Sequence, residues 1–477
     1  MRAPIRNAGP LRGPRLQGAL FVSCAAALAV WVGAQVSKSD GSTLAAPVIG
    51  LTALAGGIIL FSVPVEKVFL GWLLVAPLFQ GAADETSVGR PLSFAFYLAP
   101  PLVMAVQTAM QWRRRTDESF VDVLPVLFLG YVALSAFLTS TMAEEDPTGL
   151  VKELFQVTAI GVLTYYFLVF GPGARVPGRA IVRVVFLAAI LQALFAIVEW
   201  PTGWGLWGTS WWHGADPPRA VATLASPGAL GTYLGCAIVL ALAILAWEGP
   251  VKLRPLSWIV LLVGVPGLFL TITRGPIVAA LIASLGVLLL APRARLVALG
   301  IVAASALALI AAWPQLTQAE LYQKRIAEQV NIEGREDVQD ASIAAASQKP
   351  VLGWGYGSFD KAKLAVADQI NVRVEGSLET TSHNGLLTIL VEFGAVGLLL
   401  LLVPWVVICL RGVGLVRRHA PDRWLVVGSV AAVSVFVLNA MTTDLKYFSI
   451  ISTLPWLFVG LVRRASDSGG TTSTSSS

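Results

Sequence analysis

Residues that bind metals or form disulfides are scarce in this sequence. Its 477 residues include only three cysteines and three histidines. Cys24, Cys236 and Cys409 fall within apolar runs, and their spacing fits neither a metal site nor a disulfide framework. The histidines lie far apart along the chain, so they do not predict a metal centre either. We therefore expect no metal and no cofactor.

Charged residues are also few. They make up 13% of the chain, whereas 56% is hydrophobic and the mean hydropathy is +0.74. A soluble domain carries roughly 25% charged residues. Apolar stretches of roughly 20 residues, enough to span a bilayer as a helix, recur from end to end. This composition predicts an all-α polytopic integral membrane protein, with a single membrane domain over residues 1–477.

The same length rule predicts about fourteen membrane spans, with twelve as the alternative count. The first span follows an arginine-rich start, but no small-residue cleavage site comes after it, so we interpret it as a retained anchor. The third, from Val65 to Gln80, is short. The centres of the expected spans lie near Ala27, Thr52, Leu73, Pro101, Phe128, Ile160, Ala189, Tyr233, Val263, Ala283, Ala303, Leu398, Ala432 and Leu454.

The distribution of lysine and arginine predicts the orientation, because short loops rich in these residues stay in the cytoplasm. With the N-terminus inside, the cytoplasmic loops and tails hold 21 basic residues, whereas the short loops of the opposite side hold 6. We therefore expect both termini in the cytoplasm. The net charge of +6 follows from this asymmetry, which fits membrane lipid as a partner and gives no indication of nucleic acid.

One long loop, residues 314–383, falls on the outer side and is too long for a simple connection. Helical spacing of its apolar residues predicts a helix over Ala319–Val330 and a second over Arg335–Gln348, after Gly334. The run "KPVLGWGYGSF" holds three glycines that allow a tight backbone path. We expect a folded lid on the membrane surface. At the C-terminus, the polar segment 465–477 is expected to be a disordered tail.

Arg274 stands in the short outer hairpin of "LFLTITRGPIVAALIAS", between two apolar spans and without an acidic neighbour in the local sequence. A guanidinium near hydrocarbon is costly unless an anion pairs with it, so Arg274 is a candidate ligand for an anionic substrate group. The alternative is that its side chain reaches lipid headgroups. Because Arg274 lies on the face that is poor in basic residues, we favour the functional interpretation.

Two further arginines are expected on the same face. Arg335 is predicted at a helix start, where its guanidinium and the free N–H groups of the first turn could bind one phosphate. The alternative is an exposed ion pair with Glu336 or Asp340. Arg219, in "DPPRAVATLASPGALGTYLG", opens the span near Tyr233, where it is either functional or simply interfacial.

His383 opens the apolar run "HNGLLTILVEFG". Ser382 or Thr381 is expected to cap the helix that follows, which places the imidazole at a helix N-terminus, where the dipole keeps the ring neutral. A neutral imidazole can accept a proton from a hydroxyl as a general base. The alternative is a capping or interfacial histidine. His419 joins the cytoplasmic arginines and His213 lies in a tryptophan-rich outer loop, so both are weaker candidates.

The expected outer face thus combines arginines with a neutral imidazole. Fixed positive charge stabilises a departing phosphate or pyrophosphate, and a neutral imidazole can activate an acceptor hydroxyl. This combination predicts transfer of a group from a lipid-diphosphate donor to an alcohol.

Several motifs occur in a fixed order between about Arg219 and Phe393: "TRG" at Thr273–Gly275, "GREDVQDA" from Gly334, "KPVLGWGYGSF" and "HNGLLTILVEFG". Together with the long outer loop, this ordered set resembles the signature of the O-antigen ligase and Wzy-type polymerase superfamily. The earlier segment "RAVATLASPGALGTYLG" is similar to a looser motif of the same superfamily.

This resemblance implies an inverting, metal-independent glycosyltransferase with a GT-C-like helical membrane fold. The donor would be an undecaprenyl-diphosphate-linked saccharide, and the acceptor a hydroxyl of a glycan or glycolipid. The reaction would take place on the outer face of the bacterial cytoplasmic membrane. The resemblance further implies that Arg274 and Arg335 hold the donor diphosphate, with Arg219 as a third contact.

It also implies that His383 activates the acceptor hydroxyl and that Asn384 and Glu392 support the site. A ligase joins the glycan to another lipid or protein, whereas a polymerase extends another lipid-linked repeat. The sequence does not choose between them, because acceptor recognition would lie in the tryptophan-rich loop and the lid.

A membrane transporter of an anion or of a lipid-linked glycan is the competing class. Many spans and arginines at membrane depth would fit it as well. The sequence does not have paired inverted halves with broken helices, nor a series of carboxylates for ion coupling, which are typical of secondary transporters. We therefore favour the enzyme.

Overall fold

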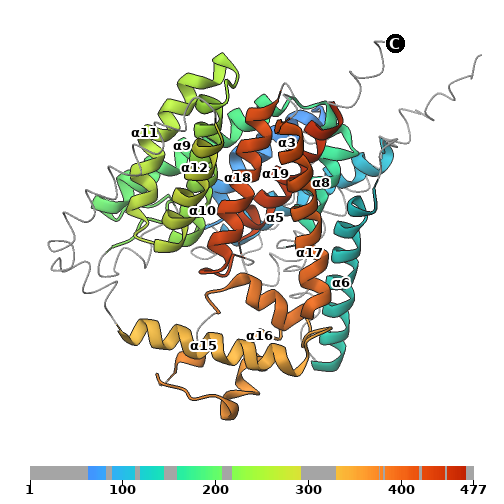
Figure 1. Ribbon diagram of the computed structural model, residues 1–477, viewed down its shortest axis with the longest axis vertical. Coiled ribbons are helices and arrows are strands. Elements are labelled where there is room, and N and C mark those ends of the chain that lie inside the picture. Colours follow the sequence, from blue (N-terminus) through green and yellow to red (C-terminus); the bar gives the residue numbers. More distant parts are fainter. Residues whose placement is uncertain are drawn as a thin grey trace, which may run out of the picture. The chain divides into compact units, whose positions relative to one another are not determined.

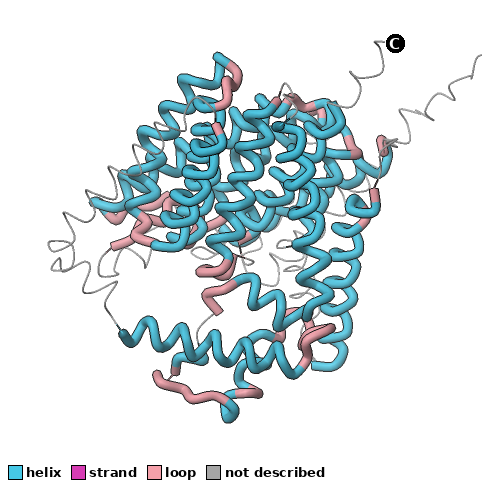
Figure 2. Tube along the Cα trace, viewed as in Figure 1, coloured by secondary structure: helices cyan, strands magenta, loops and turns pink. Residues whose placement is uncertain are grey.

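The computed structural model describes residues 63–81, 89–112, 119–143, 158–206, 218–291, 329–374, 376–379, 382–417, 422–445 and 448–468. Within these ranges every regular element is a helix, as the composition predicts (Figures 1 and 2). The chain divides into two compact units after Phe69. The single membrane domain over residues 1–477 stays a prediction. The first unit is described only over residues 63–69, which include the start of α3 (Val65–Phe79), and all contacts below lie within Leu70–Ser477.

Each expected span centre that falls in the described residues lies in a helix, whereas the centres near Ala27, Thr52 and Ala303 lie outside them. Six described helices are long and apolar enough to cross a bilayer. The structure thus agrees with a polytopic membrane protein, and the count of about fourteen spans stays a prediction. The bundle helices are α5 (Gly89–Met110), α6 (Leu124–Ala143), α8 (Ile160–Val169), α9 (Gly178–Thr202), α10 (Pro227–Ala246), α11 (Arg254–Leu270), α12 (Arg274–Leu290), α17 (Gly385–Arg417), α18 (Arg423–Ala440) and α19 (Ser449–Ser468).

Two expected boundaries can be compared directly with helix ends. Helix α3 ends at Phe79, which confirms that the third apolar segment is short. Helix α19 continues to Ser468, so the first residues of the predicted tail 465–477 are helical, and the rest of that tail lies outside the described residues.

Helix α10 is the centre of one half of the bundle. It packs against α9, α11, α12 and α18 and is the most buried of the six long apolar helices. Small residues allow the close approach: a side chain at Gly231 would collide with Pro276, and one at Gly235 would crowd Ala280. Lipid tails provide no hydrophobic drive between helices, so close packing of small residues holds such a bundle together. This packing fixes α12, whose first residue is Arg274.

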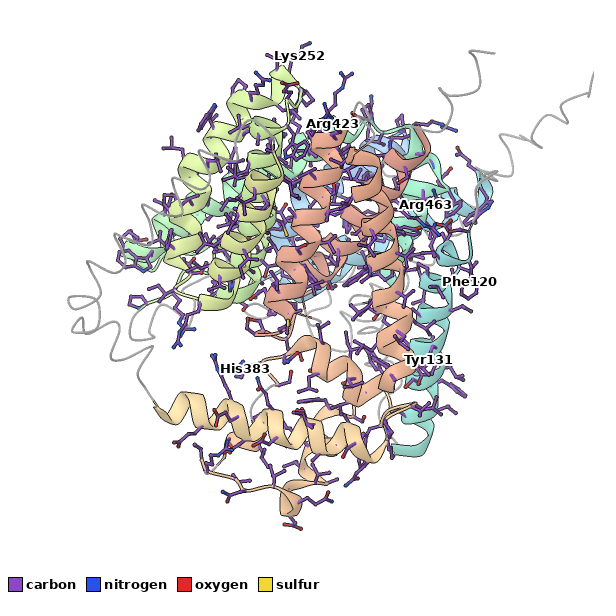
Figure 3. The ribbon with its side chains drawn as sticks, in the orientation of Figure 1. Phe120, Tyr131, Lys252, His383, Arg423 and Arg463 are labelled. Carbon is purple, nitrogen blue, oxygen red and sulfur yellow. The ribbon has the colours of Figure 1, made fainter. Side chains whose placement is uncertain are left out.

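A buried ion pair joins α6, α8 and α19 in the other half. The Nε of Arg463 lies 3.0 Å from a carboxylate oxygen of Asp122, and the Tyr165 hydroxyl donates to the same carboxylate at 2.7 Å. Asp122 ends η1 (Phe120–Asp122), directly before α6. Removal of either partner would leave a buried charge uncompensated, so the pair holds this end of α6 in place. Figure 3 shows Phe120 and Arg463 near each other, with Tyr131 farther along α6.

Residues 329–379 form the lid, built from α15 (Gln329–Gln348), α16 (Phe359–Leu364), η6 (Ala367–Gln369) and η7 (Ser377–Glu379). Its apolar side chains gather into a core that includes Val338, Phe359, Val366 and Leu378, and Val391 of α17 joins this core. Figure 1 shows α15 and α16 beside the ends of α6 and α17. The lid is therefore a folded element, and its position outside the cell stays a prediction.

Helix α15 starts earlier than predicted. The sequence predicted a helix from Arg335 after Gly334, whereas α15 begins at Gln329 and passes through Gly334. One glycine costs a helix only about 1 kcal/mol, and a Cβ there would meet the Ser377 Cβ at 3.7 Å and the Val374 Cβ at 4.0 Å, both ordinary contacts. Arg335 is therefore not at a helix N-terminus, and no free first-turn N–H groups accompany it. Of the predicted helix Ala319–Val330, only the last two residues are described, and they belong to α15.

A backbone clasp joins the lid to α17. Helix α17 is kinked at Gly394, where φ is 61° and ψ is −167°. At this kink the Trp354 N–H donates to the Val391 carbonyl at 2.9 Å, and the Ala395 N–H donates to the Pro350 carbonyl at 2.8 Å. The lid thus satisfies backbone groups that the kink removes from the helix ladder.

The glycine-rich run of the lid takes the tight path that the sequence predicted. Gly353, Gly355 and Gly357 all have left-handed φ angles, of 75°, 108° and 70°. Helix α6 supports this run, because the Tyr131 hydroxyl donates to the Leu352 carbonyl at 2.8 Å. These contacts fix the lid over one end of the bundle.

Candidate functional site

His383 lies directly before α17, between the lid and the bundle (Figure 3). The helix cap is Asn384, whose side-chain oxygen accepts the N–H of Leu387 at 3.1 Å. The predicted cap, Ser382 or Thr381, is therefore wrong for Ser382, whose hydroxyl instead accepts the N–H of Asn384 at 3.1 Å; Thr381 lies outside the described residues. This turn gives His383 a left-handed φ of 49°. A non-glycine residue in this region is uncommon and worth explaining.

The connection between α18 and α19 packs against the same turn. The buried carboxylate of Asp444 accepts hydrogen bonds from the hydroxyls of Thr388 at 2.8 Å and Ser382 at 3.2 Å. The N–H of Gly385 also donates to the Thr443 carbonyl at 3.4 Å. These contacts bring an acidic group from the C-terminal part of the chain beside His383.

Arg274 is an exposed residue at the first position of α12. A side chain at the next residue, Gly275, would collide with the Thr442 hydroxyl and the Asn439 side chain at the end of α18. Asn439 is itself buried and donates to the Thr232 hydroxyl of α10 at 2.6 Å. Because residue 275 has no side chain, Arg274 lies close to the end of α18, from which the chain leads to Asp444.

The acidic residues near Arg335 pair with another arginine. Arg373 lies 3.0 Å from Glu336, 3.4 Å from Asp337 and 3.1 Å from Asp340. The alternative interpretation of Arg335, a pair with Glu336 or Asp340, is therefore not what the structure shows. Within the described ranges, no ion pair or hydrogen bond of the Arg335 side chain is formed.

The backbone next to Arg219 contacts the end of α11, close to the hairpin of Arg274. The N–H of the next residue, Ala220, donates to the carbonyl of Leu270 at the end of α11, at 3.0 Å. Leu270 precedes the Arg274 hairpin by only a few residues. Arg219 is half-buried there. The structure thus places the segment that carries Arg219 beside the turn that carries Arg274.

Electrostatic interactions link the candidate residues pairwise, Arg274 with Arg335 and Arg335 with His383. The surrounding protein lowers the pKa of Arg335, and the charge of Arg274 lowers this pKa further. Burial lowers the pKa of His383 below its ordinary 6.5, and Arg335 and Lys363 lower it further, whereas Asp444 raises it. Arg335 nevertheless keeps solvent-exposed surface. The site thus holds a histidine that is neutral near pH 7 beside several cations.

Two residues of this group, Lys363 and Asp444, were not predicted. Lys363 in α16 is almost fully buried, lies 2.7 Å from Asp360 and packs over the Phe359 ring. The sequence "FDKAKL" shows no more than an ordinary charged helix. Asp444 follows two threonines between two apolar spans, and this polar outer turn is the signal that would have identified it.

Glu392 is fully buried in α17, about two turns beyond His383. Its backbone carbonyl accepts the N–H of Gly355 at 2.9 Å, so Glu392 lies where the lid is joined to α17. Support of the site by its carboxylate stays a prediction. Asn384 caps the start of α17 beside His383, and its support of the site likewise stays a prediction.

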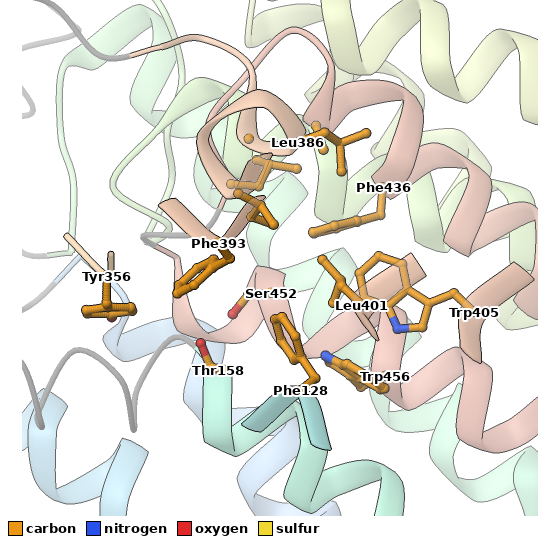
Figure 4. Close-up of a pocket in the computed structure, with 14 residues that line it drawn as sticks. Phe128, Thr158, Tyr356, Leu386, Phe393, Leu401, Trp405, Phe436, Ser452 and Trp456 are labelled. Carbon is orange, nitrogen blue, oxygen red and sulfur yellow. The ribbon is translucent and has the colours of Figure 1, made fainter. Parts of the chain in front are cut away.

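An apolar cavity of about 70 Å³ lies below the start of α17 (Figure 4). One water needs roughly 10–15 Å³ in this measure, so the cavity has room for a short run of hydrocarbon. It extends from residues next to His383 to aromatic side chains deeper in the bundle. The residues around it include Leu386, Phe393, Tyr356, Phe128, Trp405 and Trp456.

The described part of the chain holds no group of three histidine, cysteine, aspartate or glutamate residues that could bind a metal ion.

Comparison with known proteins identifies the stretch that holds most of these residues. Residues 259–402 match the family model Wzy_C, described as O-antigen ligase. The chain is similar to O-antigen ligases over this stretch, which is called the O-antigen ligase domain below. No curated protein matches the sequence. The resemblance inferred from the motifs is confirmed, and the O-antigen ligase domain indicates a glycosyl-transfer enzyme of the bacterial inner membrane that acts on lipid-linked saccharides and glycans.

The O-antigen ligase domain contains Arg274, Arg335 and His383, whereas Arg219 and Asp444 lie outside the matched residues. Arg219 lies in the segment that precedes α10, and Asp444 lies in the α18–α19 connection. The candidate residues therefore extend beyond the matched stretch.

Proposed function

We propose that this protein transfers a saccharide from an undecaprenyl-diphosphate-linked donor to a hydroxyl of a glycan or glycolipid acceptor. Arg274, Arg335 and Arg219 hold the donor diphosphate, and His383 is the general base. Transfer takes place on the outer face of the bacterial cytoplasmic membrane, with both chain termini in the cytoplasm. The observation that carries the proposal is that the turns of Arg274 and His383 both pack against residues 442–444 after α18, while Arg335 lowers the pKa of His383.

The reaction is a single displacement. The acceptor oxygen attacks the anomeric carbon as His383 takes its proton, and the bond between that carbon and the diphosphate oxygen breaks. The diphosphate leaves with the bonding electrons, and the guanidinium groups stabilise its charge. One displacement at one carbon inverts its configuration. No step requires a metal ion, because the arginines carry the positive charge that the leaving group needs.

The lowered pKa of His383 supports its role as base. A general base must be unprotonated at working pH, and burial together with neighbouring cations favours the neutral ring. Asp444 opposes this shift and would stabilise the imidazolium that forms during transfer. Ser382 and Thr388 already donate hydrogen bonds to that carboxylate, so we assign it an electrostatic role.

The apolar cavity beside the site supports a lipid-linked donor. Leu386 immediately follows the His383 turn, and Phe393 and Trp405 continue the lining toward the interior of the bundle. A prenyl chain that enters here would leave its diphosphate at the arginines.

The ends of the bundle support the orientation. Figure 3 shows Lys252 and Arg423 at one end and His383 at the other. Basic residues favour the cytoplasmic side, so His383 would face outward.

Reconstitution of the purified protein tests the proposal. Nanodiscs would be supplied with an undecaprenyl-diphosphate-linked oligosaccharide and a glycan or glycolipid acceptor, and the product separated by gel electrophoresis. We expect product from the wild type and a loss of roughly 10²-fold or more from His383→Ala. His419→Ala is the matched control and should retain activity. Undiminished transfer by His383→Ala would exclude this histidine as base.

The acceptor decides between ligase and polymerase. After deletion of the gene, loss of all surface-attached glycan would indicate a ligase, whereas glycan of a single repeat would indicate a polymerase. Counter-flow of a labelled anion in proteoliposomes, without any saccharide transfer, would instead support a transporter and contradict the proposed function.

A further inference from the structure

Helix α9 directs two buried polar side chains toward the segment that precedes α10. Gln192 and Glu199 are seven residues apart, about two turns on one helix face, and both are almost fully buried. A carboxylate in a mostly apolar helix that is long enough to cross the membrane is costly. Such a residue is retained where it makes specific contacts.

Glu199 contacts two consecutive backbone groups of this segment. One of its carboxylate oxygens accepts the N–H of Val221 at 3.0 Å and the N–H of Ala222 at 2.6 Å. Gln192 continues the row, because its side-chain oxygen accepts the N–H of Thr223 at 3.2 Å. Three successive N–H groups are thus held by α9.

The backbone that these side chains hold is strained. Ala222 has φ of 52° and Ala225 has φ of 62°. The left-handed conformation costs a residue other than glycine roughly 1–2 kcal/mol of free energy. This conformation persists only if its surroundings impose it. The two hydrogen bonds that Glu199 accepts are contacts that impose this conformation.

The same segment is tied on its other side to the candidate site. The Ala220 N–H donates to the Leu270 carbonyl at 3.0 Å, next to the turn that leads to Arg274. Arg219 therefore stands one residue from a bond to α11 and two residues from a bond to Glu199. Neither of these two bonds uses the Arg219 side chain.

We propose that Glu199 is a positioning residue, which holds the backbone of residues 221–222 and thereby directs Arg219 toward the donor diphosphate. The inference rests on the proposed function, since Arg219 must contact the donor for Glu199 to act through it. Glu199 itself touches neither substrate nor reacting atoms. Its function is to supply one oxygen that accepts two N–H groups.

A double-mutant cycle tests this role in the full-length protein in nanodiscs. The variants are Glu199→Ala, Arg219→Ala and the double variant, and kcat/KM is measured for the lipid-linked donor. We expect Arg219→Ala to lose roughly 10- to 100-fold and Glu199→Ala about 10-fold, from the range for bonds to charged groups. In the Arg219→Ala background, Glu199→Ala should cost less than about two-fold, because residues that act as a unit are not additive.

Two further variants sharpen the cycle. Glu199→Gln keeps a side-chain oxygen for the two N–H groups and should stay within about three-fold of the wild type. Asp122→Asn changes another buried carboxylate, far from the candidate site, so any loss it causes should be the same with and without Arg219. Hydrogen exchange of the amides of residues 221–222 should accelerate in Glu199→Ala and not in Asp122→Asn.

Each outcome decides a separate question. If Arg219→Ala leaves kcat/KM unchanged, the donor contact of the proposed function fails at Arg219. If Arg219→Ala is impaired while Glu199→Ala is not, or if the two losses simply add, only the role of Glu199 is overturned. If Glu199→Gln is as impaired as Glu199→Ala, the acceptor mechanism is wrong. Should Glu199→Ala not fold, Glu199→Asp, whose oxygen is withdrawn by one methylene, replaces it in the cycle with the same expectation of coupling.

Discussion

The carboxylate of Asp444 accepts a hydrogen bond from the Thr388 hydroxyl at 2.8 Å. This bond ties the α18–α19 connection to the first turn of α17. His383 stands directly before that turn. The charges that set its pKa come from separate elements: Arg335 from α15, Lys363 from α16 and Asp444 from this connection. The environment of the histidine is therefore assembled by the lid together with the bundle.

The pH dependence of transfer follows from the pKa of His383. Burial and the two cations lower this pKa below 6.5, and a general base works only when it is neutral. We expect kcat/KM for the acceptor to be level near pH 7 and to fall as the pH decreases through the lowered pKa. A pH series of initial rates would measure the midpoint of that fall. A midpoint above 6.5 would contradict the assignment.

Substitution of the neighbouring charges should move this midpoint in opposite directions. Asp444 raises the pKa of His383, so Asp444→Asn should shift the fall to lower pH. Lys363 lowers the same pKa, so Lys363→Met should shift the fall to higher pH. The measurement is the same pH series on both variants. Shifts of equal sign would show that the two residues act on something other than the imidazole.

The two arginines of the O-antigen ligase domain should act on the donor. Arg274→Ala and Arg335→Ala should each lower kcat/KM for the donor by roughly 10- to 100-fold, since a bond to a charged group contributes about 1.5–3 kcal/mol. Lysine at either position should restore only part of the lost kcat/KM, because lysine keeps the positive charge but not the planar guanidinium that forms two parallel hydrogen bonds. Lys252→Ala, at the opposite end of the bundle, is the matched control (Figure 3). Equal losses from all three alanine variants would exclude a specific donor contact.

Substitutions of two acidic residues of α15 should have very different effects on the stability of the lid. Asp337 is fully buried and accepts the N–H groups of Arg373 and Val374 at 2.9 Å each. Asp337→Ala should therefore destabilise the lid by about 3 kcal/mol, whereas Asp340→Ala removes an exposed ion pair and should cost less than about 1 kcal/mol. The rate of hydrogen exchange of the amides of residues 373–378 would be measured in both variants. Equal exchange in the two variants would mean that Asp337 does not hold this segment.

The clasp between the lid and α17 depends on a residue without a side chain. A Cβ at Gly394 would collide with the Val351 carbonyl, and the left-handed φ of 61° adds strain. Gly394→Ala should therefore open the clasp, expose the lid to limited proteolysis and abolish transfer. Gly414→Ala, a helix position where a Cβ would meet no other atom within 4 Å, is the control. Full protection of the lid in Gly394→Ala would show that the kink tolerates a side chain.

Much of the candidate site could be predicted from local patterns. The isolated arginine in "TRG" and the histidine before an apolar run stood out, because polar groups at the edge of hydrocarbon need a partner or a role. Lys363 gave no such signal, since its burial results from the packing of α16 on α15 and α17. The start of α15 was predicted too late because Gly334 was interpreted as a boundary, although the helix passes through it.

The cap of α17 shows the same limit at the scale of one turn. Thr381, Ser382 and Asn384 are all good caps by residue type, and composition cannot rank them. Asn384 takes the position because the Ser382 hydroxyl is used by the Asn384 N–H and by Asp444. The contact of Ser382 with Asp444, which is distant in the sequence, thus decided which residue caps α17.

The sequence by itself determined that this protein is a bundle of apolar helices with a folded lid, because hydrocarbon admits only backbone that satisfies its own hydrogen bonds. It also determined which arginines and which histidine were candidates. Only the tertiary structure decided that Asp444 and Lys363 join them and that Glu199 holds the segment of Arg219. Those relationships depend on contacts between helices far apart in the chain, and no local pattern records which helices meet.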